Sequence, residues 1–427
     1  MDKQKILNLL KSEMAPALGV TEPATIALST ARAYQKVGGK ITRIELELDP
    51  GIYKNSYACS IPNTNHKGIH MAALLGAVNG QPDLGLEVFD KISDQDINNA
   101  QRLYEKEDIV QIKIKEGNKK IYCSSTVETE QGYAKVVIEE SHNNIVYIEH
   151  NGQKVYGEKN KKKEKSNNEK SCIEFTEISK FIDELSYDDV KFSLAAVDMN
   201  NKLASKGMKD VGLGVGYQLN ELIKDGHIKD DLVNSAKRLT AYAVDARMGG
   251  VPLPAMSFCG SGDHGIIATL PLKAFETREQ ISKKILAKSI VLSYLITYYL
   301  KNKTGKLSAY CGCAVAAGTG ASAGIAYLLN GSQNQIEGAI NNMAGNITGM
   351  ICDGGNFGCS LKAATAAGAA VEAALFAIQD HYLEKNTGIV GQSIKETLDN
   401  MAKIATPGMN QTNNIILEIL KNREEKD

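Results

Sequence analysis

Two hydrophobic patterns divide the chain. Between residues 41 and 156, apolar and polar residues alternate with a period of two, which predicts half-buried strands, in the runs ITRIELELDP, DIVQIKIKEG, KKIYCSSTVET, YAKVVIEES and NIVYIEHNG. From Cys172 onwards apolar residues recur every three or four positions, which predicts helices almost throughout. The pattern indicates an α+β protein, with a mainly α-helical domain and a smaller mixed α+β domain that contains an antiparallel sheet.

Shorter segments give further predictions. GIYKNSYACSIP, residues 51–62, predicts a second strand, and HMAALLGAVNG, residues 70–80, predicts a helix. The Gly- and Pro-rich segment 249–265 predicts a long loop. ATPGMNQTNN, residues 405–414, predicts the end of the last helix before a polar tail.

A charged run separates the two patterns. GEKNKKKEKSNNEKS, residues 157–171, has no apolar side chain that could pack on a core, so it predicts a linker. The expected organisation is a pair of helices packed on the helical domain, an α+β domain, the linker and an all-α catalytic domain, over residues 1–40, 41–156, 157–171 and 172–427.

Composition narrows the class of protein. A net charge of −1 gives no reason to expect nucleic acid or an anionic membrane as a partner. The N-terminus lacks the apolar region of a secretory signal, and the apolar stretch 285–300 is too short to span a bilayer. Eight cysteines without an export signal indicate a reducing cytoplasm, in which they are free, metal-bound or catalytic. The composition is also compatible with a homo-oligomer.

Half of the cysteines lie within residues 307–361. They are Cys311, Cys313, Cys352 and Cys359. Two cysteines in a glycine-rich loop and one at a helix start can converge, and three thiolates on an iron–sulfur cluster leave one iron free to bind substrate. Spacing alone favours the alternative, that these are buried small hydrophobic residues, because C-x6-C is not a ferredoxin spacing.

Other polar residues are candidates for substrate binding. Thr21 and Glu22 precede Pro23 at a helix start, which favours an anion site or a plain helical corner. The loop 249–265 carries Ser261, Asp263 and His264, and its backbone N–H groups either hold a carboxylate or form a structural crossover.

Two more residues have candidate roles. Arg247 in DARMGG could clamp a carboxylate or form a helix-end ion pair. His66 lies in a loop without zinc spacing nearby, where it could move a proton or simply be partly exposed.

The motifs just described resemble those of a known family. PALGVTEPATIAL, DARMGGVPLPAMS, GSGDHG, LSAYC, GMICDGGNFGCSLK and IVGQSIKETLDNMAKIATPGMNQT span residues 16–412. They are similar to the serine dehydratase α-chain-like family, and within it to the L-cysteine desulfidase group, which is also catalogued as an uncharacterised protein family.

The resemblance implies a function and a cofactor. It implies a [4Fe–4S] cluster held by Cys311, Cys352 and Cys359, with Cys313 and Cys259 as neighbours or as a fourth ligand. It also implies an iron–sulfur-dependent lyase that converts a small L-amino acid, such as cysteine or serine, to a 2-oxo acid and ammonia. The substrate would then be bound by Thr21, Arg247, Ser261 and Asp263, with its carboxylate at the helix start after Thr21 and the loop 260–265.

One position departs from the family pattern. The desulfidase pattern reads G-C-T-E-P, whereas this chain has Val20 at the cysteine, which the family uses as base or proton donor. Candidates for the displaced base are His264, His66 and Glu22. The alternatives are a catalytically altered member that binds a cluster or an amino acid without turnover, and a cofactor-free helical protein.

Overall fold

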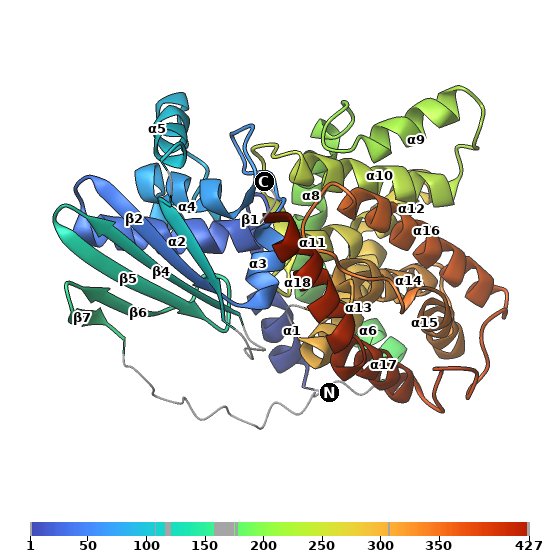
Figure 1. Ribbon diagram of the computed structural model, residues 1–427. Coiled ribbons are helices and arrows are strands. Elements are labelled where there is room, and N and C mark those ends of the chain that lie inside the picture. Colours follow the sequence, from blue (N-terminus) through green and yellow to red (C-terminus); the bar gives the residue numbers. More distant parts are fainter. Residues whose placement is uncertain are drawn as a thin grey trace.

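The structure is a computed structural model that describes residues 2–106, 108–115, 121–157, 175, 178–305 and 308–424. It has two parts side by side, a sheet with its own helices and a larger helical part (Figure 1). The α+β class predicted from the sequence is confirmed. Of the predicted linker, only Gly157 lies within the described residues.

The sheet has six strands in the order β3-β2-β4-β5-β6-β7. The strands are β2 (Ile41–Leu48), β3 (Val110–Ile114), β4 (Tyr122–Thr129), β5 (Gly132–Glu139), β6 (Ile145–His150) and β7 (Gln153–Tyr156). All neighbours are antiparallel except β2 and β3, which are parallel. A parallel pair needs a long crossover, and the chain between these strands forms helices α3 (Pro50–Ser56), α4 (Gly68–Asn79), η1 (Pro82–Glu87) and α5 (Asp94–Tyr104).

The first helices divide between the two parts. Helix α1 (Lys3–Ser12) places Ile6, Leu7 and Leu10 in the helical core. Helix α2 (Thr21–Val37) instead packs on α4, β4 and β5, so the expectation that residues 1–40 lie together on the helical domain is wrong for α2. Small residues let α2 and α4 pack closely. A Cβ added at Gly76 of α4 would lie 2.5 Å from the carbonyl of Ala27 in α2.

The strand predicted at residues 51–62 is wrong, because its first half is helix α3. Asp49 caps this helix, accepting hydrogen bonds from the backbone N–H groups of Gly51 and Ile52 at 2.7 and 3.1 Å. Pro50 occupies the first turn, where its missing N–H has no cost. These local start signals outweigh the alternation of apolar residues that favoured a strand.

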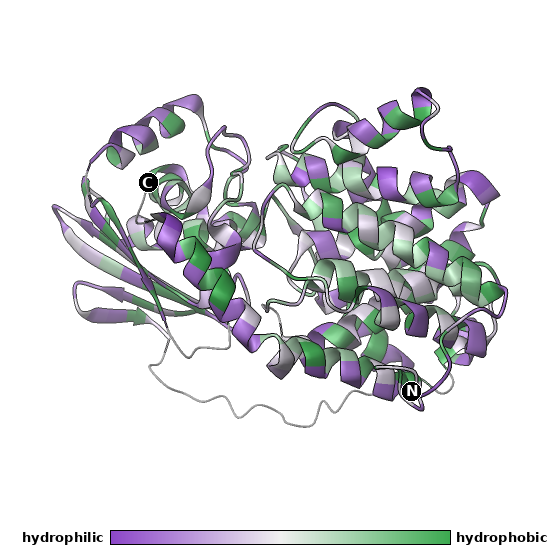
Figure 2. Ribbon diagram, turned by 45° about the vertical axis from the view of Figure 1, so that its right-hand side comes forward, coloured by the Kyte–Doolittle hydropathy of each residue, from purple (hydrophilic) through white to green (hydrophobic). Residues whose placement is uncertain are grey.

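The larger part is built from helices around a single core. They are α6 (Ile178–Glu184), α7 (Tyr187–Val190), η2 (Lys191–Ser193), α8 (Leu194–Lys206), α9 (Val215–Lys224), α10 (Leu232–Met248), α11 (Gly262–Ile267), α12 (Leu270–Glu279), α13 (Lys283–Thr304), η3 (Cys313–Ala317), α14 (Gly318–Leu328), α15 (Gln333–Ile347), α16 (Cys359–Ile378), α17 (Ile394–Lys403) and η4 (Ile404–Gly408). The last helix, α18 (Asn410–Glu424), belongs to the other part and is described below. Apolar and polar residues mix along these helices, as in helices that bury one side (Figure 2).

The segment predicted as a long loop contains regular structure. Strand β8 (Ala255–Phe258) pairs antiparallel with β1 (Met14–Ala17), and the short helix α11 follows it. The Ser257 hydroxyl adds a hydrogen bond of 2.6 Å to the carbonyl of Ala15. The strands are too short for a period to show in the sequence, and their pairing joins residues about 240 positions apart.

The predicted polar tail is helix α18, which lies between the two parts in Figure 1. Ile416, Leu417 and Leu420 are buried in the core of the sheet part. Each part therefore completes its core with a helix from the far end of the chain, α1 for the helical part and α18 for the sheet part.

Candidate functional site

Two of the predicted ligand cysteines lie on adjacent backbone segments. The Cys311 N–H donates to the carbonyl of Met350 at 3.0 Å, and the Cys352 N–H donates to the carbonyl of Ala309 at 2.6 Å. These bonds flank an antiparallel bridge between Tyr310 and Ile351. The structure thus brings together two cysteines that are 41 positions apart in the sequence.

The third cysteine begins a helix one loop further on. Cys359 starts α16, and its thiol lies 3.7 Å from the carbonyl of Gly354. Burial raises the pKa of Cys311 to about 12, and a negative charge on Cys352 raises it too. Burial also raises the pKa of Cys359, with further contributions from Asp263, Cys352 and Cys311. Charge on Cys352 thus reaches Cys311, and charges on Cys311 and Cys352 reach Cys359.

Two lysines lie close to these cysteines. The buried Lys54 Nζ donates to the carbonyls of Ser308 and Cys352 and to Oδ1 of Asn413, each at 3.0 Å. Burial lowers the pKa of Lys301, while nearby thiols, including Cys313 and Cys352, act in the opposite direction. Cationic groups in these places would balance the negative charge of bound thiolates.

Free cysteines with lysine neighbours fit an iron–sulfur cluster. Cys311, Cys352 and Cys359 form no disulfide. Within the described part of the chain, no three His, Cys, Asp or Glu side chains are close enough to hold a single metal ion. The donor set itself, three cysteines free of disulfides, is of the chemical kind that holds iron–sulfur clusters.

A polar wall forms at the start of α2, around the buried carboxylate of Glu22. The Thr21 hydroxyl lies 2.8 Å from Glu22 Oε2 and 3.1 Å from the carbonyl of Gly260. Asn55 Nδ2 donates to Glu22 Oε1 at 2.8 Å, and His142 Nε2 lies 3.9 Å from the same oxygen. Residues from α2, α3 and the β5–β6 turn thus hold one carboxylate in place.

A buried ion pair stands beside this wall. Arg247 Nη1, in the last turn of α10, lies 2.8 Å from Asp263 Oδ1 in α11, and both residues are less than 5% exposed. Burial lowers the pKa of Arg247, but the negative charges of Asp263 and Glu22 outweigh this effect. The net pKa is raised, so the guanidinium stays charged. Its Nε is buried without a hydrogen-bond partner among the described residues. A Cβ at Gly262 would lie 2.5 Å from this Nε, so the free N–H sits against the GSGD turn.

His264 and Ser261 lie next to the segment that carries Cys311 and Cys313. Burial lowers the pKa of His264 well below its usual value, and the charge of Lys301 lowers it further, so the ring is neutral. His264 Nδ1 lies 3.1 Å from the carbonyl of Phe258, and a Cβ at Gly312 would meet Nε2 at 2.8 Å. The Ser261 hydroxyl lies 3.6 Å from the thiol of Cys313. Cys313 therefore faces the turn of residues 260–263.

His66 and Val20, both singled out from the sequence, differ in how they relate to the site. No hydrogen bond or ion pair of the described residues joins the His66 ring to the site, and its backbone carbonyl closes a turn with Ile61. Val20 is the N-cap of α2 and is buried in the helical core, while its neighbour Leu18 is buried in the core of the sheet part. The candidate site therefore lies at the seam between the two cores.

The sequence interpretation missed four of the polar side chains at this seam. They are Lys54, Asn55, His142 and Lys301. Lys54 and Asn55 belong to α3, which the alternating pattern placed in a strand. No local signal marks His142, because only the fold brings the β5–β6 turn to α2.

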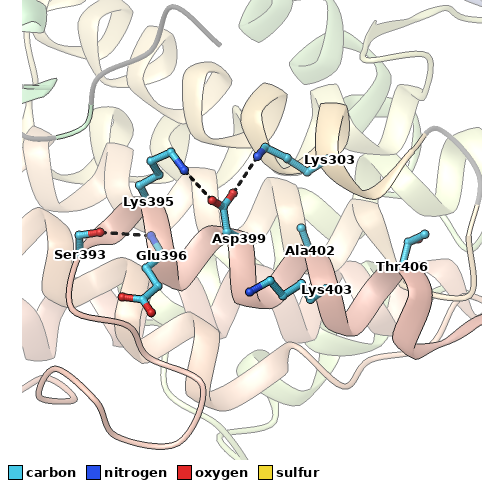
Figure 3. Close-up of a pocket in the computed structure, with 8 residues that line it drawn as sticks. All are labelled: Lys303, Ser393, Lys395, Glu396, Asp399, Ala402, Lys403 and Thr406. Carbon is cyan, nitrogen blue, oxygen red and sulfur yellow. Dashed lines mark hydrogen bonds and ion pairs between the residues drawn. The ribbon is translucent and has the colours of Figure 1, made fainter. Parts of the chain in front are cut away.

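A separate hollow of about 410 Å³ lies at α13 and α17, away from the cysteines (Figure 3). Asp399 accepts from Lys303, Lys395 and Tyr299, at 3.1, 2.7 and 2.7 Å. Asp399 thus balances part of the charge of Lys303 and Lys395, and the residues that line the hollow include none of the predicted site residues.

One described helix, α16, is long and apolar enough to cross a membrane by length and composition alone. About 61% of its most apolar stretch is buried inside the protein. Such burial is consistent with the core helix of a soluble protein.

Comparison with known proteins identifies the family. A family model described as serine dehydratase alpha chain matches residues 83–418. A UPF0597 protein of Clostridium botulinum is 44% identical over 98% of this chain and 99% of its own length. UPF0597 proteins of Clostridioides difficile and Clostridium tetani are 38% and 35% identical, over 99% and 98% of this chain and 100% and 98% of their own lengths. The chain therefore belongs to the serine dehydratase alpha chain family.

Proposed function

We propose that this protein is an iron–sulfur-dependent lyase that acts on a small L-amino acid. It removes a β-substituent and the amino group, and releases a 2-oxo acid and ammonia. One observation carries the proposal: three free cysteines from distant segments adjoin a buried polar wall that holds Glu22 and the unmatched N–H of Arg247. Membership of the serine dehydratase alpha chain family supports a lyase-like role in amino-acid metabolism.

The cofactor would be held by Cys311, Cys352 and Cys359. A [4Fe–4S] cluster with three thiolate ligands supplies a Lewis-acidic iron that can stabilise the charge developing on a leaving heteroatom. Lys54 and Lys301 balance the charge of the thiolates. Such clusters are sensitive to oxygen, so we also propose a reducing, cytoplasmic location.

The substrate would lie between the cysteines and the polar wall. Arg247 Nε–H binds its carboxylate, since a buried guanidinium N–H without a partner gains most from an anionic acceptor. The Glu22 carboxylate, fixed by Thr21 and Asn55, faces the ammonium group. A base takes the α-proton, the β-substituent leaves, and the enamine tautomerises and hydrolyses. Cysteine would give pyruvate, sulfide and ammonia, and serine would give pyruvate and ammonia.

An anaerobic assay tests the proposal. Protein purified or reconstituted without oxygen is expected to contain iron and acid-labile sulfide, and to release ammonia from L-cysteine, L-serine or a related β-substituted amino acid. Cys352→Ser should lose both the iron and the activity. Cys123→Ser is the matched control, because Cys123 is buried in β4 beside Ser29 and Ser125, away from the site. Equal iron content in the two variants would rule out the assigned ligands.

Val20 supports a second candidate function. A valine can neither give nor take a proton, and this one lies where the related desulfidases carry a cysteine. The chain could then bind a cluster or an amino acid without turnover. This candidate predicts amino-acid binding by calorimetry, with no ammonia released from any β-substituted amino acid.

A further inference from the structure

A buried lysine lies against the segment that carries Cys311 and Cys313. Lys301, near the end of α13, is 5% exposed. A Cβ built on Gly312, between the two cysteines, would lie 2.8 Å from Lys301 Nζ. A side chain at this position would meet the ammonium group, so glycine allows the lysine to approach the backbone of the cysteine segment.

His264 reaches the same point from α11. A Cβ on Gly312 would also lie 2.8 Å from His264 Nε2, so the imidazole and the ammonium group are neighbours. His264 Nδ1 lies 3.1 Å from the carbonyl of Phe258, and a carbonyl can only accept, so Nδ1 carries the ring proton. The ring is neutral, and Nε2 therefore presents a lone pair. A lone pair at this place helps to keep the positive charge of Lys301 beside the cysteine segment.

Four thiols interact with this charge. Burial lowers the pKa of Lys301, while Cys313, Cys259, Cys352 and Cys311 act in the opposite direction. A lysine is rarely buried so completely unless negative charge accompanies it. Thiolates bound to a cluster would supply that charge and would favour the ammonium form. The position of Lys301 is thus explained by an anionic group at the cysteines.

The other lysines near the cysteines have different partners. Lys54 donates to two carbonyls and to Asn413, so it joins backbone segments. Lys362 forms an ion pair with Asp353, whose carboxylate cancels part of its positive charge. Lys301 adjoins thiols instead, so its charge acts most directly on whatever the thiols bind.

We propose that the Lys301 ammonium group, held beside His264 at Gly312, raises the reduction potential of the cluster. This inference rests on the proposed function, because it needs a cluster bound by the cysteines. Reduction adds one electron to the cluster, and a buried positive charge nearby stabilises the more negative state. The same charge would stabilise an anionic substrate group at the open iron, so Lys301 would also support the Lewis acidity that the lyase requires.

The test separates the charge of Lys301 from its packing. Lys301→Met removes the charge and keeps the length of the side chain, whereas Lys301→Arg keeps the charge. Lys288→Met is the matched control, because it removes another buried lysine of α13 that lies about 20 Å away at 1.5 Å per residue and donates to the carbonyl of Asp183. Gly312→Ala adds a methyl group where the two side-chain tips meet.

All proteins are reconstituted without oxygen. Iron and acid-labile sulfide report on cluster content, and melting temperatures check folding. The midpoint potential is measured in a redox titration that follows the reduced cluster by electron paramagnetic resonance. This readout does not depend on turnover, so it remains informative in variants that release no ammonia.

The expected result follows the charge. Lys301→Met should shift the reduction equilibrium at least about tenfold towards the oxidised cluster, which lowers the midpoint potential by about 59 mV for one electron. Lys301→Arg and Lys288→Met should keep the wild-type potential. Gly312→Ala should lower the potential by a smaller amount, because the charge is displaced but not removed.

The remaining outcomes also decide the question. A wild-type potential in Lys301→Met with full iron content, or an equal shift in Lys288→Met, would overturn the inference and leave the proposed function standing. Loss of the cluster from Lys301→Met but not from Lys301→Arg would support it, since only the charge separates these variants. Loss from both would reduce Lys301 to a packing role. Wild-type protein that binds no cluster would overturn the proposed function and this inference together.

Discussion

The buried Lys54 provides the sharpest test of how the site is held together. Its ammonium group joins the segment before Cys311, the carbonyl of Cys352 and Asn413 of α18, through hydrogen bonds of 3.0 Å. Lys54→Met keeps the length of the side chain and removes all of these donors. Two carbonyls and one amide oxygen then lose a buried partner.

The magnitude follows from the three contacts. Hydrogen bonds from a charged group contribute about 1.5–3 kcal/mol each, or about 4.5–9 kcal/mol for three in isolation. Recovery of the ammonium's desolvation penalty offsets several kcal/mol, which leaves a net loss of about 3 kcal/mol in the free energy of unfolding. For 427 residues the entropy of unfolding is about 0.9 kcal/mol/K, so the melting temperature should fall by about 3 °C.

The assay compares two buried lysines. Lys288 of α13 is 7% exposed and donates one hydrogen bond of 2.7 Å, to the carbonyl of Asp183. Urea denaturation should show a loss of about 1 kcal/mol for Lys288→Met, because one contact is removed. Iron content after reconstitution should fall in Lys54→Met alone. Equal stability losses with full iron content in both variants would refute the idea that Lys54 holds the cysteine segments together.

Two further predictions concern substrate binding and pH. Arg247→Lys should raise KM at least about tenfold with a smaller change in kcat, since lysine lacks the N–H at Nε, while Arg238→Lys on the same helix should leave KM unchanged. Burial raises the pKa of Asp49 to about 6, above its value in the unfolded chain, so the folded protein binds the extra proton. The stability that this proton contributes is present below about pH 4 and is lost as the pH rises to about 6, a change of about 2–3 kcal/mol. Urea titrations at several pH values should show this dependence in the wild type and a flatter one in Asp49→Asn; parallel curves would contradict it.

The pattern of the sequence predicted the elements whose period is long enough to show. The alternating runs became β2 to β6, and the helical spacing gave most of the larger part. It failed at α3, where Asp49 and Pro50 start a helix inside a segment with a strand-like alternation. It also failed at β1 and β8, since four-residue strands carry no usable period and their pairing depends on the whole fold.

The candidate site was predictable only in part, and for a physical reason. Cysteine spacing could not indicate that Cys311 and Cys352 share a backbone bridge, so their association came from resemblance to a family. Asn55, Cys59 and His142 reach the seam from elements whose packing no local signal encodes. A buried seam between two cores collects side chains from distant segments, and sequence windows cannot register that convergence.

The crossed terminal helices have a consequence for motion. Helix α1 packs in the helical core and α18 packs in the core of the sheet part. The chain therefore crosses between the two parts near both of its termini. A hinge opening of the two parts would have to bend the chain after α1 and before α18 at the same time. We therefore expect amino acids to reach the seam through local rearrangement of surface segments, such as the turn around Lys67 that rests on Phe357, while the two bodies keep a fixed relative orientation.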